Sequence, residues 1–247
     1  FENLMTRIDF GDDSHNYFGY DADSKRVEKV DSAGYARFVY QGPDMLKLLQ
    51  EQDADGDAAV QYTMGGALEA MRRANGGGLS GGATSFYHFD WLGSPFALTD
   101  ATAAATDTYL YDAWGEVLNR TGSATNPHTY IGKERYYRMP NASLYHLGFR
   151  DYAAGLGRFM TVDPKRDGVN WFAYTENAPT MAIDALGQDP IFSCESALQF
   201  RYWEDLFYAM HDAVNAAYPE RDLRNCRSTM DRLGMWNLAV LARCIIY

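Results

Sequence analysis

The stretch 150–187 contains two aspartates whose carboxylates could support acid–base chemistry. Asp163 stands before Pro164, and Asp184 begins the segment Asp184-Ala185-Leu186-Gly187. Two carboxylates that lie close together cannot both ionise cheaply, so one can take a proton from water while the other donates one. Asp also bonds its own backbone and is common in turns. The residues alone leave both interpretations open.

The chain before these aspartates carries a loose internal repeat. Aromatic residues, several of them followed by Asp, recur about every twenty residues, a spacing typical of repeat architectures. Within a repeat a β-prone stretch, a turn-rich stretch and a second β-prone stretch follow one another, as at 17–20, 21–24 and 27–30. The pattern predicts a mainly β fold of antiparallel hairpins with Tyr and Val on one face. The recurring positions are Tyr20, Tyr40, Tyr62, Phe89, Tyr111 and Tyr130.

Two segments have some features of ligand-binding loops. Asp53-Ala54-Asp55-Gly56 spaces its carboxylates like a calcium loop, but its glycine is displaced and no closing Glu follows, so we predict a hairpin turn. The glycine-rich run 75–82 lacks the ending of a phosphate loop, and we predict a long mobile loop between strands. His88 and His128 are interpreted as ordinary polar residues. We therefore expect neither a metal nor an organic cofactor.

Composition narrows the possible partners. The net charge of −11 argues against nucleic acid and against anionic lipid as primary partners. No apolar run reaches the roughly 18 residues that a membrane-spanning helix needs. Aromatic residues make up 15% of the chain and include 18 Tyr, which favours β-structure.

The last part of the chain, 188–247, has a different character. Apolar residues recur there at every fourth position, a pattern that predicts an amphipathic helix, and a second helix is predicted after Asp222. Its three cysteines match no metal pattern, and their disulfide state is left open. No catalytic constellation identifies an activity for this region. The first helical stripe is Leu198, Tyr202, Leu206, Met210 and Val214, and the cysteines are Cys194, Cys226 and Cys244.

Several motifs together resemble the YD-repeat family, which includes the bacterial Rhs proteins and the C component of the Tc toxins. Tyr87-His88-Phe89-Asp90-Trp91-Leu92-Gly93-Ser94-Pro95 is similar to the family's YHYDxLGSP block, and Tyr111-Asp112-Ala113-Trp114-Gly115 to its YDAWG block. Gly157-Arg158-Phe159 through Asp163-Pro164, then Asn170, Phe172, Tyr174, Asn177 and Pro179, follow the order of its closing core. The resemblance covers roughly residues 17–187 and is strongest in the Rhs-associated core, roughly 86–187.

The resemblance implies a spiral, hollow β-shell that encloses a C-terminal polypeptide. We therefore expect a YD-repeat shell over residues 1–187 and a helical variable region, the cargo, over 188–247. Because the chain begins at Phe1 within the repeat pattern, we expect it to be a fragment or a cleaved product. The expected partners are the chain's own tail and either the rest of a longer YD-repeat chain or a partner shell subunit. The expected location is secreted or at the cell surface.

The family's closing core acts as an aspartyl self-protease, and this implies a role for particular residues here. The carried-over pair is Asp163 and Asp184, with Arg150 beside it and Asp151 adjacent. Cleavage is expected near Gly187, Gln188 and Asp189. The chain departs from the family at Ala185, where Pro is usual, and at Gln188, where Leu is usual, so whether it is cut is an open question. The alternative is a structural or adhesive surface protein that stays uncut.

Overall fold

The computed structural model describes residues 4–42, 47–65, 67–166, 169–188 and 190–192. The chain divides into two compact units, Phe1–Ile191 and Phe192–Tyr247. Nearly all of the described residues belong to the first unit. The predicted tail helices, the three cysteines and Asp189 lie outside the described residues, so those expectations and the boundary at residue 187 stay predictions.

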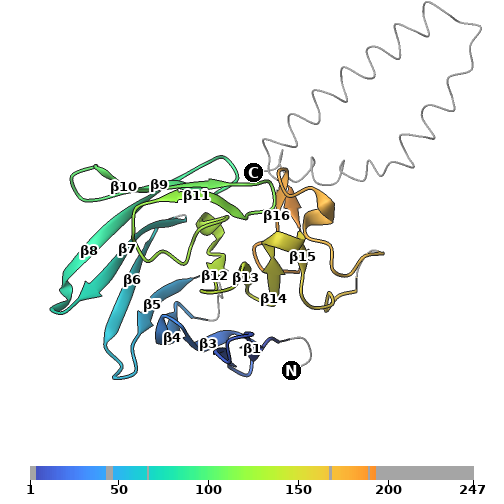
Figure 1. Cartoon of the computed structure of the whole chain (residues 1–247), viewed down its shortest axis with the longest axis horizontal. Coiled ribbons are helices and arrows are strands. Elements are labelled where there is room, and N and C mark those ends of the chain that lie inside the picture. The colour runs from blue at the N-terminus through green and yellow to red at the C-terminus, as the bar shows by residue number, and fades with distance from the viewer. Residues whose placement is uncertain (1–3, 43–46, 66, 167–168, 189, 193–247) are drawn as a thin grey trace, which may run out of the picture. The chain divides into compact units, whose positions relative to one another are not determined.

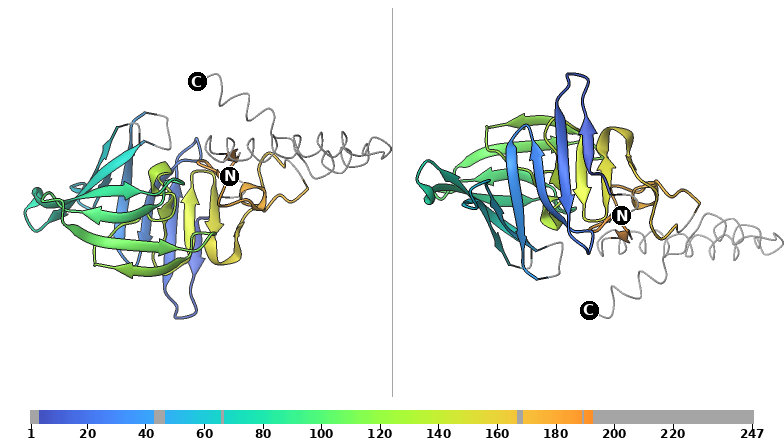
Figure 2. Two further views of the ribbon diagram at one scale, coloured as in Figure 1. Left: turned by 90° about the horizontal axis from the view of Figure 1, so that it is seen from above. Right: turned by 90° about the horizontal axis from the view of Figure 1, so that it is seen from below.

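An antiparallel sheet of eleven strands, each paired with its neighbours in sequence, forms most of the described structure (Figure 1). The strands follow one another round a curve from the N-terminal end to β11 (Figures 1 and 2). The mainly β, antiparallel prediction is confirmed. The strands are β1 (Arg7–Asp9), β2 (His15–Tyr20), β3 (Arg26–Asp31), β4 (Gly34–Tyr40), β5 (Leu48–Gln52), β6 (Ala58–Met64), β7 (Leu68–Asn75), β8 (Gly78–Phe89), β9 (Pro95–Thr99), β10 (Ala105–Tyr111) and β11 (Val117–Thr121).

One type of turn joins many of these strands. In the predicted turn at Asp53, the Oδ1 atom accepts a hydrogen bond from the N–H of Asp57, four residues on, at 2.9 Å. Gly56, three residues on, has a φ of 86°, which glycine adopts without steric cost. Such a turn needs only an Asp and a residue that tolerates a left-handed conformation. The same bond to the residue four positions on recurs at Asp21, Asp90, Asp100 and Asp112.

The glycine-rich run is a hairpin rather than the long mobile loop that we predicted. Strand β7 ends at Asn75 and β8 begins at Gly78, so the connection is two residues long. A Cβ atom at Gly82 would lie 2.2 Å from the carbonyl oxygen of Arg73. The glycines therefore serve the close approach of paired strands, where the register also shifts. That prediction was wrong because glycine marks loops and close-packed strands alike.

The curved sheet buries one of its faces. Along β6 the side chains alternate, and Val60 and Tyr62 on the inner face are only 0% and 4% exposed. The segment 126–138, which includes β12 (Tyr137–Arg138), covers this face (Figure 1). The Tyr137 ring lies 5.2 Å from that of Phe38 on β4, in an edge-to-face arrangement. His128 packs between Tyr62 and Tyr137, with ring centroids 5.0 and 5.5 Å away.

A smaller sheet and its own core follow. The sheet consists of β12, β13 (Leu144–Leu147), β14 (Arg150–Ala153) and β15 (Arg158–Phe159), and β16 (Ala182–Ile183) pairs with β17 (Ile191–Phe192). Its core is built mainly from tyrosines, including Tyr130, Tyr136, Tyr145, Tyr152 and Tyr174. The helical elements of the described residues are three short 3-10 turns, η1 (Gly132–Glu134), η2 (Ala154–Leu156) and η3 (Thr175–Asn177). In this part of the chain no helix has the length and apolar character to cross a bilayer.

Candidate functional site

Arg150 brings the two aspartates of the closing core together. Its Nη2 atom lies 3.3 Å from Oδ2 of Asp163 and 3.4 Å from Oδ2 of Asp184. All three side chains are largely removed from solvent, since Arg150 is 3%, Asp163 8% and Asp184 1% exposed. Ion pairs are much less screened in such surroundings than at the surface. The structure thus brings two buried carboxylates and one guanidinium together at one place.

The second oxygen of each carboxylate belongs to a turn. Oδ1 of Asp163 accepts the N–H of Lys165 at 2.7 Å, and Oδ1 of Asp184 accepts the N–H of Gln188 at 2.9 Å. The third residues after them, Arg166 and Gly187, have φ values of 51° and 69°. Both aspartates therefore make turns like those of the hairpins. The turn interpretation and the acid–base interpretation are compatible, because each carboxylate uses one oxygen for the turn and turns the other toward Arg150.

The peptide bond between Gly187 and Gln188 is held at both of its polar atoms. The Nε atom of Arg150 donates a hydrogen bond to the carbonyl oxygen of Gly187. The amide nitrogen of the same peptide is the group that donates to Asp184. Gly187 allows this approach, because a Cβ there would lie 3.0 Å from the Leu147 carbonyl oxygen and 3.1 Å from Arg150. A donor therefore faces the carbonyl oxygen, and a carboxylate faces the nitrogen.

Trp171, in the segment between the two aspartates, positions one side of the site. The carbonyl oxygen of Trp171 accepts the N–H of Asp163 at 2.8 Å and Nη1 of Arg150 at 3.3 Å. The guanidinium of Arg150 also lies over the ring of Phe159, 3.6 Å from its centroid. The sequence motif contains Phe159, but its type alone does not assign it to the site. Its contact with Arg150 depends on the pairing of β14 with β15.

Tyr136 positions the other aspartate and was missed by the sequence reasoning. Its hydroxyl oxygen accepts the N–H of Asp184 at 2.9 Å, and the hydroxyl donates to the carbonyl oxygen of Asp184 at 2.8 Å. Burial raises the pKa of Tyr136 well above its ordinary value, and the negative charge of Asp184 adds to this. The hydroxyl therefore keeps its proton and remains a donor. No local sequence signal relates Tyr136 to a residue 48 positions away.

Asp151 does not join this group, although we expected it to line the site. Its Oδ1 atom lies 3.0 Å from Nη2 of Arg26 on β3 and 2.8 Å from Nδ1 of His146 on β13. The reason is the alternation of side chains along β14, which turns Asp151 and Arg150 to opposite faces. Burial alone would raise the pKa of Asp151, but Arg26 and His146 together hold it below its ordinary value. Asp151 thus joins the small sheet to the large one.

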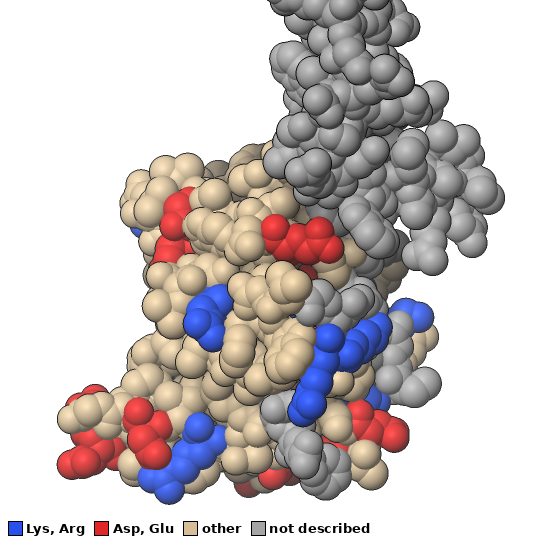
Figure 3. Space-filling view, turned by 90° about the vertical axis from the view of Figure 1, so that its right-hand side faces the viewer, with Lys and Arg blue, Asp and Glu red and all other residues tan. Residues whose placement is uncertain are grey.

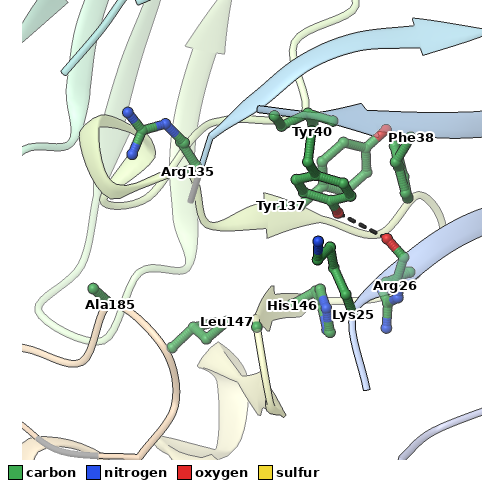
Figure 4. Close-up of a pocket in the computed structure, with 11 residues that line it drawn as sticks. Lys25, Arg26, Phe38, Tyr40, Arg135, Tyr137, His146, Leu147 and Ala185 are labelled. Carbon is green, nitrogen blue, oxygen red and sulfur yellow. Dashed lines mark hydrogen bonds between the residues drawn. The ribbon is translucent and has the colours of Figure 1, made fainter. Parts of the chain in front are cut away.

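A small cavity lies next to the Asp184 segment (Figure 4). Its volume is about 30 Å³, and Ala185, Leu147 and His146 are among its lining residues. A volume of this size is sufficient for one water molecule. The described residues contain no group of three His, Cys, Asp or Glu side chains that could hold a metal ion.

Comparison with known sequences gives relatives of much greater length. The chain is 30% identical over 179 residues to the tRNA nuclease WapA of Bacillus subtilis, a match that covers 69% of this chain and 7% of WapA. It is 28% identical over 147 residues to the toxin protein Tse5 of Pseudomonas aeruginosa, covering 59% of this chain and 10% of Tse5. It is also 27% identical over 150 residues to human Teneurin-4, covering 59% of this chain and 5% of Teneurin-4. No family model matches the chain.

Solved structures share the fold. The crystal structure of TcdB2-TccC3 matches with a TM-score of 0.54 and 18% identity, over 75% of this chain and 10% of that one. The Tc holotoxin pore of Photorhabdus luminescens, with the TccC3 mutation D651A, matches with a TM-score of 0.54 and 16% identity, over 76% of this chain and 9% of that one. This chain therefore has the β-sheet fold of part of the TcdB2-TccC3 toxin structures, and it is similar in sequence to a small part of bacterial proteins named as toxins and nucleases.

Proposed function

We propose that this chain is the C-terminal part of a YD-repeat shell of the Rhs toxin type, and that it cuts itself once after Gly187. Asp163 and Asp184 are the catalytic carboxylates, and Arg150 is the electrophilic partner. Residues 188–247 are the cargo, which the shell encloses or releases. The sequence likeness to the tRNA nuclease WapA and the toxin protein Tse5, and the fold likeness to TcdB2-TccC3, support the family.

One observation carries the proposal. The Gly187–Gln188 peptide lies between the two groups that its hydrolysis would need, because Arg150 donates to its carbonyl oxygen and Asp184 lies 2.9 Å from its nitrogen. A donor fixed at the carbonyl oxygen stabilises the negative charge that develops there when water attacks. Since the substrate is the same chain, proximity supplies much of the rate, and a single turnover is sufficient.

The reaction requires one proton on the pair of carboxylates. Asp163 takes a proton from the attacking water, and the water oxygen bonds to the Gly187 carbonyl carbon. Arg150 stabilises the resulting oxyanion. In the intact chain Asp184 accepts the N–H of Gln188. In the tetrahedral intermediate that nitrogen becomes pyramidal and gains a free lone pair, so Asp184 gives it a proton as the carbon–nitrogen bond breaks. The products are a carboxyl group on Gly187 and an amine on Gln188, so one water is consumed and the pair of carboxylates regains its single proton.

The proposal extends to partners and location. The chain spans only 7–10% of WapA and Tse5 and 10% of the TcdB2-TccC3 chain. A longer YD-repeat chain, or a partner subunit, supplies the remainder of the shell in our proposal, and the complete protein is secreted or acts at the cell surface. The cargo keeps its association with the shell after the cut, because its apolar helix stripe favours an interior over water.

A second candidate is a structural or adhesive YD-repeat protein that stays in one piece. Two observations favour it. The bond from Gln188 to Asp184 has the same geometry as the turn bonds at Asp53 and Asp112, where no cleavage is proposed. Teneurin-4 is among the relatives.

Intact mass separates the two functions. The protein is purified, denatured and measured by mass spectrometry. We expect two fragments, one that ends at Gly187 and one that begins at Gln188. A cut one residue later would move Gln188 to the first fragment and would correct the position alone. A single full-length mass after prolonged incubation would support the structural protein.

A further inference from the structure

A second, larger cavity lies on the concave face of the large sheet, away from the candidate site. Its volume is about 310 Å³, within the lower range of small-molecule sites. The sheet forms one wall, and the segment 122–127 together with β12 forms the other. Small side chains leave the space open, namely Ala33, Ala36, Ala59, Ser123 and Ala124.

Strand register accounts for the residues in the sheet wall. Phe38 is paired with Glu51, Glu51 with Val60, and Val60 with Arg73, so these residues form one row across β4 to β7. Directly paired residues point to the same face of a sheet. Because Phe38 and Val60 are buried on the concave face, Glu51 and Arg73 also point to that face.

The lining is cationic in an acidic protein. Four basic side chains line the cavity, Lys29, Arg73, Arg120 and Arg138, against one carboxylate, Glu51. On the face shown in Figure 3, by contrast, basic and acidic groups are interspersed. The net charge of −11 gives no indication of such a site. The local composition of the cavity therefore differs from that of the whole chain.

Two of the four cations are already neutralised. Nζ of Lys29 lies 2.6 Å from Oδ2 of Asp31, and Nη2 of Arg120 lies 3.3 Å from Oδ1 of Asp107. Glu51 is also engaged, because its Oε1 atom accepts hydrogen bonds from the hydroxyls of Tyr62 and Tyr137.

Arg73 and Arg138 remain without a carboxylate partner among the described residues. Nη2 of Arg73 donates to the carbonyl oxygen of Thr125 at 2.9 Å. Its Nε–H is buried and, within the described part of the chain, meets no acceptor. A buried donor without an acceptor costs free energy, which a bound acceptor would recover. Arg138 lies at the same cavity on β12.

We propose that this cavity binds a small molecule that carries a carboxylate or phosphate group, held by Arg73 and Arg138. A guanidinium suits such oxyanions, because its fixed donors match two acceptor oxygens at once. The anionic group satisfies the buried Nε–H of Arg73 and balances the two charges. The remainder of the ligand occupies the space beside the alanine side chains.

The test uses the full chain and two probes, inorganic phosphate and acetate, each against sodium chloride at equal ionic strength. A ligand that binds only the folded state raises the unfolding midpoint. We expect at least one probe to raise the unfolding midpoint of the parent protein. Calorimetry should show that Arg138→Gln binds the probe at least about tenfold more weakly than the parent does, which is the loss expected for a charged hydrogen bond. Arg73→Gln also removes the bond to Thr125, so Arg138→Gln is the deciding variant.

Two further variants test whether binding depends on the cavity rather than on the charge of the whole protein. Arg37→Gln, at an exposed position on β4, removes the same charge outside the cavity and should leave binding unchanged. Ala59→Leu fills part of the cavity without any change of charge and should weaken binding. The proposal is wrong if neither probe affects the parent protein more than chloride does, or if Arg138→Gln and Arg37→Gln respond equally.

Discussion

Arg150 and Gly187 are joined by a hydrogen bond from the Nε atom to the carbonyl oxygen, across 37 residues of sequence. The same guanidinium contacts Asp163 and Asp184 through Nη2. One side chain thus fixes the carbonyl that we propose to be attacked and both carboxylates that we propose to be catalytic. Substitutions at these positions can separate this chemistry from the structural role of the same residues.

Replacement of either carboxylate by its amide should leave the chain uncut. Asp163→Asn and Asp184→Asn keep the side-chain shape and an acceptor for the turn, but the amide cannot take or give the proton. The loss of an acid or base costs roughly 10²–10⁴ in rate. Mass spectrometry of the denatured protein measures the uncut fraction.

The matched control for this pair is Asp53→Asn, which changes a half-buried aspartate that accepts a turn bond from the residue four positions on. It should be cut as the parent is. Full cleavage of the Asp163→Asn, Asp184→Asn double variant would show that another protease makes the cut.

Arg150→Lys should slow cleavage although it keeps the positive charge. A single ammonium cannot reach the Gly187 carbonyl, the Trp171 carbonyl and both carboxylates together. Removal of a donor at a developing oxyanion costs roughly 10²–10³ in rate. A time course of the cut fraction measures this, with Arg158→Lys on the exposed side of β15 as the control. Equal rates for the two variants would contradict the role of Arg150.

Gly187→Ala should destabilise the fold more than Gly56→Ala. Both glycines have a positive φ, 69° and 86°, so each substitution costs about 1–2 kcal/mol for the left-handed conformation. Only Gly187 has close neighbours, since a Cβ at Gly56 meets nothing within 4 Å. Denaturant unfolding in an Asp163→Asn background measures both free energies. Equal losses would mean that the contacts around Gly187 relax easily.

Asp151→Asn should lower stability without removing the cutting groups. The substitution leaves Arg26 buried without its charged partner, and breaking a buried ion pair in this way costs about 3–5 kcal/mol. The double variant Arg26→Met, Asp151→Leu should recover part of this loss. Denaturant unfolding measures the free energy of unfolding of the single and the double variant. If Asp151→Asn kept full stability and lost cleavage, Asp151 would belong to the catalytic site after all.

Stability should fall as the pH is lowered from about 6.5 toward 3, in part because of His128. Burial lowers the pKa of His128 to about 3, whereas an unfolded histidine titrates near 6.5. Between these values the unfolded chain binds a proton that the folded chain does not, so acid favours unfolding, by up to about 1.4 kcal/mol per pH unit.

The measurement is the free energy of unfolding against pH. His128→Phe should reduce the slope in this window. Part of the slope should remain, because burial also lowers the pKa of His146. An unchanged slope in the variant would contradict the assignment to His128.

The hairpins could be read from the sequence because their determinants are local. A turn such as that at Asp53 depends on one bond to a residue four positions on and on a glycine between them. Alternation along a strand likewise involves near neighbours, so the mainly β, antiparallel fold followed from the pattern. The prediction for the glycine-rich run 75–82 was wrong because its glycines are needed for close contact with the neighbouring strand. The local sequence pattern holds no information about that contact.

The candidate site could be predicted only in part from the sequence. Motif order related Arg150, Asp163 and Asp184, but their meeting depends on contacts that span as many as 34 residues. The support from Tyr136 to Asp184 spans 48 residues, and nothing local indicates it. Asp151 lies away from this group, beside Arg26 and His146, because adjacent residues of a strand point to opposite faces. Sequence thus determined which groups and turns are present, and tertiary packing decided which of those groups share a buried space, because burial and distance are properties of the folded chain.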